Sequence, residues 1–170
     1  MNLPHRFDVN EWFILIASVL LYTLIFFLPK RFPISQSIFI WLFNLYTANF
    51  VDFMIATKPL DLYQVNDGPD YELFDLLIYV MLYAPTAYLV IYLFDRWRPM
   101  GVKAVLYLGG WALLTTGLEE IAELCHVFEF SGWRHLYSIP VYALAYGLNL
   151  SLFRMLRLLY TDSPKRMDKG

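Results

Sequence analysis

Five long apolar segments constrain the fold more than any other feature of this chain. They cover approximately residues 11–28, 35–56, 71–94, 102–128 and 136–159 of the 170-residue sequence. Each is close to or longer than the roughly 20 residues that a helix needs to cross a bilayer. Because backbone groups cannot remain unpaired in lipid, helices are the expected conformation. The sequence therefore predicts an all-α integral membrane protein, a bundle of five transmembrane helices in a single domain covering residues 1–170.

The composition agrees with a protein embedded in lipid. Hydrophobic residues make up 59% of the chain and charged residues only 16%, whereas a soluble domain carries about 25% charge. The formal net charge of −2, without a basic patch interleaved with aromatic residues, argues against nucleic acid as a partner. The expected partner is the lipid bilayer. The single cysteine, Cys125, excludes an internal disulfide framework and a cysteine-based zinc cluster.

The positions of the basic residues predict the orientation. Three of the thirteen Lys and Arg residues, namely Arg6, Lys58 and Arg134, fall on one side of the predicted topology. The other ten fall in the loops after the first and third segments, or in or near the polar C-terminal tail, residues 161–170. The side with more Lys and Arg is normally cytoplasmic. We therefore expect the N-terminus outside and the C-terminus inside, without a cleavable signal peptide before the first segment.

Acidic residues near the end of the fourth segment are the main candidates for a functional site. Glu119, Glu120, Glu123 and His126 follow a run of fifteen uncharged residues, 104–118. At about 100° per residue, Glu119, Glu123 and His126 share one helix face, while Glu120 points to the side. Ionisable groups inside a membrane segment are costly unless they have partners, so they mark candidate sites.

Two further acids lie toward the same side of the predicted membrane. Asp52 falls near the outer end of the second segment, and Asp75 near the outer end of the third. Segments that follow one another through short loops usually pack side by side. The sequence therefore predicts an outward-facing acidic cluster that consists of Asp52, Asp75, Glu119, Glu120, Glu123 and His126.

The C-terminal half has a recognisable pattern. An intramembrane glutamate is followed by a short loop with Gly-Trp, then Tyr-Ser, then an apolar helix that ends in Phe-Arg-Met-Leu-Arg; these are Glu119, Gly132, Trp133, Tyr137, Ser138 and residues 153–157. The pattern resembles a family of small, uncharacterised polytopic membrane proteins of spore-forming Bacillus- and Clostridium-like bacteria. The resemblance covers residues 38–158 loosely and the last two segments more sharply. It implies a bacterial cytoplasmic membrane and no assigned activity. The chain departs from the pattern in the additional Glu120, Glu123 and His126.

Three interpretations of the acidic cluster remain open. In the first, the acids only fix the helix arrangement. They would be protonated or form hydrogen bonds with Asn49, Tyr79, Thr115 or Thr116, or they would pair with Arg134, Lys58 or His135. In the second, Glu119 and its neighbours form a cation or proton site in a low-dielectric pocket. A cation-coupled transport component is a related alternative. With so few helices to line a path, it would have to be a homo-oligomer.

The third interpretation is a metal-dependent enzyme. Glu123 and His126 have the Glu-x-x-His spacing of di-iron bundles, but those bundles need a second such pair and two more glutamates. The pair Glu119-Glu120 is similar to that of glutamate-type membrane proteases, but the arginine that follows in that pattern is missing. The sequence predicts no cofactor and leaves the metal unspecified. We therefore expect a non-enzymatic membrane protein whose outer acidic face binds a cation, lipid or partner, or serves assembly.

Overall fold

The computed structural model describes residues 6–66 and 72–161, which form five helical segments and one small sheet. The first two helices are α1, Val9–Phe27, and α2, Ile34–Ala56. The third segment is continuous and consists of α3, Leu73–Ile78, the π-helical turn η1, Tyr79–Tyr83, and α4, Ala84–Trp97. The last two are α5, Val102–Leu124, and α6, His135–Thr161. The strands are β1, Tyr63–Val65, and β2, Phe128–Phe130.

Four of the helical segments are long and apolar enough to cross a membrane. They are Val9–Phe27, Ile34–Ala56, Leu73–Trp97 and His135–Leu158. The fourth segment in the chain, α5, is also 23 residues long, but its glycines, threonines and glutamates lower its mean hydropathy. The prediction of a mostly helical protein is thus confirmed, and four of the five expected segments form helices with the length and composition of membrane spans.

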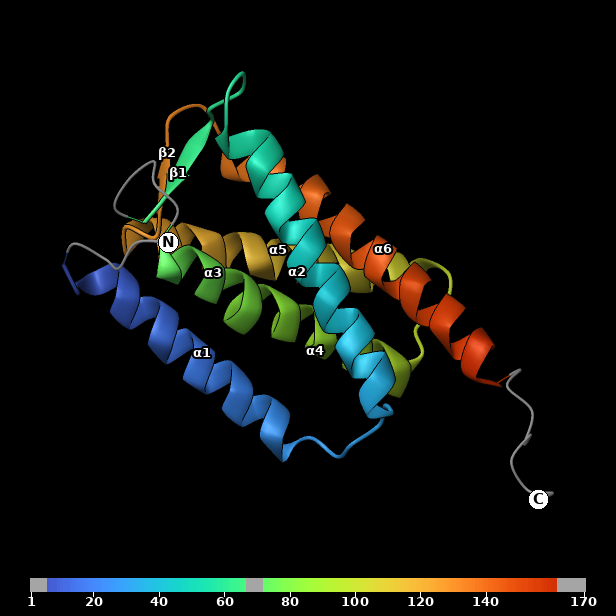
Figure 1. Ribbon diagram of the computed structural model, residues 1–170. Helices are drawn as coiled ribbons and strands as arrows, with labels where there is room; N and C mark the ends of the chain where they lie inside the picture. The colour runs from blue at the N-terminus through green and yellow to red at the C-terminus, as the bar shows by residue number, and fades with distance from the viewer. Residues whose placement is uncertain (1–5, 67–71, 162–170) are drawn as a thin grey trace.

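The central layer of the bundle is the α3–α4 segment, which Figure 1 shows in green between α1 and the other helices. Val90 and Ile91 of α4 are completely buried. By contrast, the surrounding helices expose large apolar side chains, for example Phe26 of α1 and Leu124 of α5. The beginning of α1 and the end of α6 lie at opposite ends of the bundle (Figure 1). This distribution of apolar surface is typical of a bundle whose outer faces contact lipid.

The π-helical turn η1 ends two residues before Pro85, at which the sequence predicts either a kink or a local gap in the helical hydrogen bonding. Proline has no N–H group to donate to the preceding turn, and its ring crowds the carbonyl four residues earlier. Here the chain inserts a wider turn, in which the N–H of Ala84 donates to the carbonyl of Tyr79. Such turns occur often near functional sites. This one carries Tyr83, which lines the cavity described below.

The two-stranded sheet was not predicted from the sequence. Strands β1 and β2 pair antiparallel, with Tyr63 opposite Phe130 and Val65 opposite Phe128. The fourth predicted segment extended to residue 128, but α5 ends at Leu124 and the chain turns into β2. We call the end of the bundle that carries this sheet the sheet end.

At the opposite end, charged side chains connect three parts of the chain. Asp95 of α4 accepts hydrogen bonds from Arg31, in the loop after α1, and from Arg157 of α6. Nη2 of Arg31 lies 2.7 Å from Oδ2 of Asp95. We call this end the arginine end. The ion pairs hold the α1–α2 loop and α6 against α4, because all three groups meet at one buried carboxylate.

Candidate functional site

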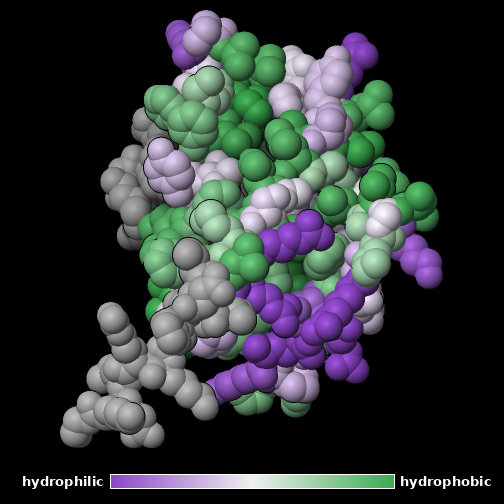
Figure 2. Space-filling model, turned by 90° about the vertical axis from the view of Figure 1, so that its right-hand side faces the viewer, coloured by the Kyte–Doolittle hydropathy of each residue, from purple (hydrophilic) through white to green (hydrophobic). Residues whose placement is uncertain are grey.

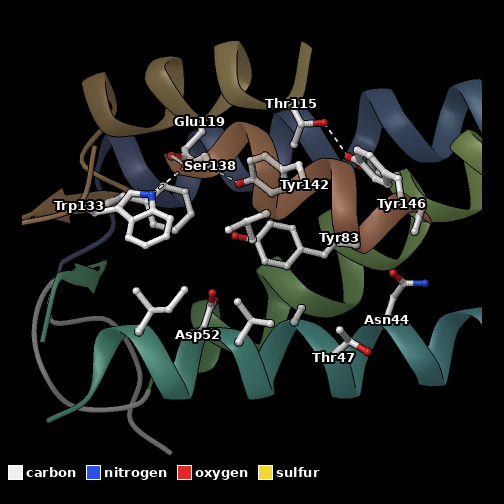
Figure 3. Close-up of a pocket in the computed structure, with 18 of the residues that line it drawn as sticks. Asn44, Thr47, Asp52, Tyr83, Thr115, Glu119, Trp133, Ser138, Tyr142 and Tyr146 are labelled. Atoms are coloured by element: carbon white, nitrogen blue, oxygen red, sulfur yellow. Dashed lines mark hydrogen bonds between the residues drawn. The ribbon is translucent and has the colours of Figure 1, made fainter. Parts of the chain in front are cut away.

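A cavity of about 140 Å³ lies near the sheet end, between α2 on one side and α5 and α6 on the other. Figure 3 shows Asp52 of α2 on one wall and Glu119 of α5 on the opposite wall. Tyr83 of η1 projects between them, and Ser138 and Tyr142 of α6 lie beside Glu119. The cavity therefore brings together acids that are 67 positions apart in the sequence (119 minus 52).

Glu119 is held by donors from α6. Its Oε1 accepts a hydrogen bond from the Ser138 hydroxyl at 2.6 Å, and its Oε2 accepts one from the Tyr142 hydroxyl, also at 2.6 Å. Nδ1 of His135 lies 3.2 Å from Oε1. The indole N–H of Trp133 in turn donates to the Ser138 hydroxyl at 2.8 Å. These donors satisfy the oxygens of a buried carboxylate. Because Ser138 and Tyr142 belong to one helix, they also fix the position of the Glu119 carboxylate.

The spacing of the residues along α5 explains this arrangement. Thr115, Glu119 and Glu123 are four residues apart and therefore share the face of α5 that packs on α6. The Thr115 hydroxyl pairs with that of Tyr146 at 2.6 Å, and Oε2 of Glu123 lies 2.7 Å from Nε2 of His135. The two helices are thus joined by polar contacts at three successive turns.

Asp52 is held from the opposite side of the cavity. Its Oδ1 accepts a hydrogen bond from the Tyr63 hydroxyl at 2.5 Å, and the Tyr79 hydroxyl also bonds to the carboxylate. Burial raises the pKa of Tyr63 far above its usual range, so this hydroxyl keeps its proton and donates it to the Asp52 carboxylate. Tyr63 belongs to β1, so the small sheet has a direct role in building the site.

An amide pair closes the cavity on the side of the arginine end. Asn44 of α2 and Asn149 of α6 exchange two hydrogen bonds, at 2.6 and 2.9 Å, and both residues are buried. Beyond them lies an apolar cluster that includes Ile40, Ile91 and Phe153. The polar lining therefore does not continue toward the arginine end.

The structure separates the six residues of the predicted cluster. Asp52 and Glu119 line the cavity, and Glu123 joins Glu119 through His135. Asp75 does not line the cavity, and its buried carboxylate accepts hydrogen bonds from the side chain of Asn66 and the backbone N–H of Glu72. The capping arrangement at the start of α3 therefore accounts for the position of Asp75.

Glu120 and His126 lie outside the cavity, and both are exposed. The prediction that His126 shares a helix face with Glu119 and Glu123 was wrong. The helix ends at Leu124, and His126 has a left-handed backbone conformation with φ of 59°. The histidine that contacts both glutamates is His135 of α6, which the sequence indicated only as one of several pairing candidates.

The tyrosines that complete the site were not predicted as site residues. Tyr142 and Tyr146 lie one helical turn apart on α6 and follow Ser138 at the same spacing. This polar stripe in an otherwise apolar helix was the available signal. Tyr63 gave no comparable signal. It lies in the three-residue strand β1, after the end of α2, so no helical spacing relates it to Asp52.

A metal-binding cluster is not found in the part of the chain that the structure describes. No three His, Cys, Asp or Glu residues among residues 6–66 and 72–161 are arranged to hold a metal ion. Glu123 lies on α5, whereas His126 follows its end. The Glu-x-x-His spacing therefore does not form the helical ligand pair that the metal-enzyme interpretation requires.

Comparisons with known proteins give no family assignment. No protein-family model matches the chain, and no significantly similar chain is found among curated proteins or solved structures. The resemblance to membrane proteins of spore-forming bacteria stays a prediction.

Proposed function

We propose that this protein crosses the bacterial cytoplasmic membrane five times, with the N-terminus outside and the C-terminus inside. Four helices have the length and composition of membrane spans. The fifth, α5, connects the end of α4 at the arginine end to the start of α6 at the sheet end (Figure 1). If the other four helices cross the membrane, α5 must cross it too. Its 23 residues give about 34 Å at 1.5 Å per residue, enough for a hydrocarbon core of about 30 Å.

The charges support the orientation. The arginine end carries Arg31 and Arg157, and Arg98 and Lys103 lie in and next to the nearby α4–α5 turn. The positive-inside rule places such an end in the cytoplasm. The cavity with Asp52 and Glu119 then lies toward the outer side of the membrane.

Within this topology, the cavity binds a small organic cation. The observation that carries the proposal is the charge of its lining. Asp52 and Glu119 face each other, and none of the 21 described residues that line the cavity is Lys, Arg or His. Carboxylates in a low-dielectric site either take up a proton or attract a cation, because an isolated buried charge is costly.

The aromatic lining favours an organic cation over a bare metal ion. Seven of the 21 lining residues are aromatic, among them Tyr83, Trp133 and Tyr142. An aromatic face contributes about 0.5–2 kcal/mol to the binding of a quaternary ammonium group. A cavity of about 150 Å³ accommodates a molecule of the size of benzene, so the volume of about 140 Å³ fits a small alkylammonium ion.

The closed end of the cavity favours binding over conduction. The Asn44–Asn149 pair and the apolar cluster beyond it separate the cavity from the arginine end. A transported cation would have to pass this apolar layer. We therefore place a transport role second, and it would require a rearrangement of α2 and α6.

The test is a thermal-stability measurement of the full-length protein in neutral detergent, with tetramethylammonium chloride compared with sodium chloride at equal ionic strength. A ligand that binds the folded state stabilises it by RT ln(1 + [L]/Kd), about 2.7 kcal/mol at 100 times Kd. We expect tetramethylammonium to raise the melting temperature of the wild type. Asp52→Asn should abolish the rise, because it removes one carboxylate charge and keeps the side-chain shape.

Glu120→Gln is the matched control, since Glu120 is exposed and next to Glu119 in the sequence. It should respond to tetramethylammonium as the wild type does. An equal response in Asp52→Asn and Glu120→Gln, or no response in the wild type, would refute the proposed site. If sodium raises the melting temperature more than tetramethylammonium does, the ligand of the cavity is an inorganic cation and not an organic one.

A further inference from the structure

A second hollow lies at the arginine end, between the end of α4, the start of the α4–α5 connection and α6. Its volume is about 310 Å³. The charged residues that line it are Asp95, Arg98, Arg154 and Arg157, and the remainder of the lining is apolar and includes Phe94 and Phe153. It shares no lining residue with the cavity of the sheet end.

The net charge of this hollow is strongly positive. Asp95 is the acidic residue in its lining, and Arg31 and Arg157 both bind the Asp95 carboxylate. The two positive charges of Arg31 and Arg157 therefore exceed the single negative charge of Asp95, and Arg98 and Arg154 add two more positive charges. With Arg31 included, the sum is four positive charges and one negative charge.

Arg98 and Arg154 are available to a ligand. Both side chains are exposed, and neither forms an ion pair within the described residues. Arg154 lies over the ring of Phe94, with its guanidinium carbon 5.6 Å from the ring centre. Arg98 has a left-handed backbone conformation, φ of 47°, at the end of α4. A guanidinium group with free N–H donors can bind a phosphate through two parallel N–H···O hydrogen bonds.

The surroundings of the hollow point to a lipid as the source of the phosphate. In the end view of Figure 2, hydrophilic side chains gather in the lower part, while much of the rest of that face is apolar. Trp97, Met100 and Val102 near the hollow are exposed apolar residues. A site with basic and apolar walls at the ends of membrane helices matches the headgroup and the first acyl carbons of a phospholipid.

We propose that the hollow binds the phosphate of an anionic phospholipid of the cytoplasmic leaflet through Arg98 and Arg154. Arg157 and Arg31 remain paired with Asp95 and add long-range attraction. The bound lipid then lies between α4 and α6 at the membrane surface. This inference rests on the membrane insertion proposed above, but it is independent of cation binding at the sheet end.

The experiment measures how short-chain phosphatidylglycerol binds to the full-length protein in a neutral detergent, by titration with a thermal or calorimetric readout. Short-chain phosphatidylcholine and inorganic phosphate are titrated in parallel. Wild type is compared with the double variant Arg98→Ala/Arg154→Ala. Arg96→Ala is the matched control, because Arg96 is an exposed arginine of α4 that does not line the hollow.

We expect phosphatidylglycerol to bind more tightly than phosphatidylcholine. Loss of one exposed guanidinium–phosphate ion pair should weaken binding about 5-fold, and loss of both about 25-fold, whereas Arg96 lies outside the hollow and loses no such pair. Arg96→Ala should change the affinity by less than about 2-fold. If the double variant does not fold, Arg98→Gln, at an exposed position outside the helices, provides the test with an expected loss of about 5-fold.

Three results would overturn the proposal. Equal binding of phosphatidylglycerol by wild type and by the folded Arg98 variant would show that these arginines do not hold the lipid. An equal loss in Arg96→Ala would indicate general electrostatic attraction instead of a site. If inorganic phosphate binds as tightly as phosphatidylglycerol, the ligand of the hollow is a soluble anion and not a lipid.

Discussion

Replacement of Glu119 tests the polar contact between α5 and α6. Most contacts of α5 with other elements are with α6. Glu119 accepts hydrogen bonds from Ser138 and Tyr142 and contacts His135, all from α6. In Glu119→Ala the two hydroxyls lose this acceptor and His135 keeps only its contact with Glu123, while the apolar contacts of the helix pair remain.

The expected cost follows from the two hydroxyl bonds. Polar contacts between membrane helices contribute about 0.6 kcal/mol on average and about 1.7 kcal/mol at most. Hydrogen bonds to charged groups in soluble proteins contribute about 1.5–3 kcal/mol. The contact with His135 adds little, because that side chain is 25% exposed. We therefore expect Glu119→Ala to lower the free energy of unfolding by about 2–4 kcal/mol.

The assay is reversible unfolding in mixed micelles with increasing sodium dodecyl sulfate, followed by far-ultraviolet circular dichroism. Glu120→Ala is the control and should stay within about 0.5 kcal/mol of the wild type, because Glu120 is exposed. Glu119→Gln should fall between them, since the amide oxygen can still accept from a hydroxyl. If Glu119→Ala and Glu120→Ala unfold at the same detergent fraction, the carboxylate does not stabilise the contact of α5 with α6.

Three further substitutions test other contacts by the same unfolding assay. Asn149→Ala should cost about 1–2 kcal/mol of unfolding free energy. Asn44→Ala should cost less in the Asn149→Ala background than in the wild type, because the two amides bond to each other. Additive costs would contradict this pair. Asp95→Ala should cost about 1–3 kcal/mol, and the difference should shrink at high salt, since Arg31 and Arg157 are partly exposed; a salt-independent difference would contradict the ion pairs. Tyr63→Phe should cost about 0.5–1.5 kcal/mol through loss of the hydroxyl donor to Asp52; wild-type stability would show that this bond adds nothing.

The helices could be predicted from the sequence because their signal is local. A continuous apolar run of about 20 residues is visible without any knowledge of its neighbours. The predicted second segment, residues 35–56, differs from α2 by one residue at its start. The effect of Pro85 was also foreseeable, since the missing N–H group acts on the preceding turn of the same helix.

The sheet could not be predicted because its signal is not local. Each strand has three residues, and the paired positions Tyr63 and Phe130 are separated by two helical segments, α3–α4 and α5. Alternation over three residues does not distinguish a strand from a loop. The same limit applies to Asp52, whose donor Tyr63 reaches it only after the sheet has formed.

The error at His126 has a different origin. The helical-face argument is valid only while the helix continues, and the acids in the last turn gave no sign of where α5 ends. The N–H of Cys125 makes the last bond to a carbonyl four residues earlier, that of Ile121, and the N–H groups of His126 and Val127 then donate to the carbonyls of Glu123 and Ala122 as the chain turns away. The partner of Glu123 is instead His135, which the next helix brings back from beyond the turn.

The two ends of the bundle satisfy their buried acids by different means, and this difference decides which ligand each can attract. At the sheet end, tyrosine and serine hydroxyls donate to Asp52 and Glu119, and the histidine that contacts Glu119, His135, is shared with Glu123, so the acids exceed it in number. A hydroxyl satisfies the lone pairs of a carboxylate but does not cancel its charge. At the arginine end, Asp95 is neutralised by guanidinium groups that exceed it in number. The first arrangement leaves a negative potential in its cavity and the second a positive one. A cation is therefore expected between Asp52 and Glu119 and an anion beside Asp95, and a single variant at either end should leave binding at the other unchanged.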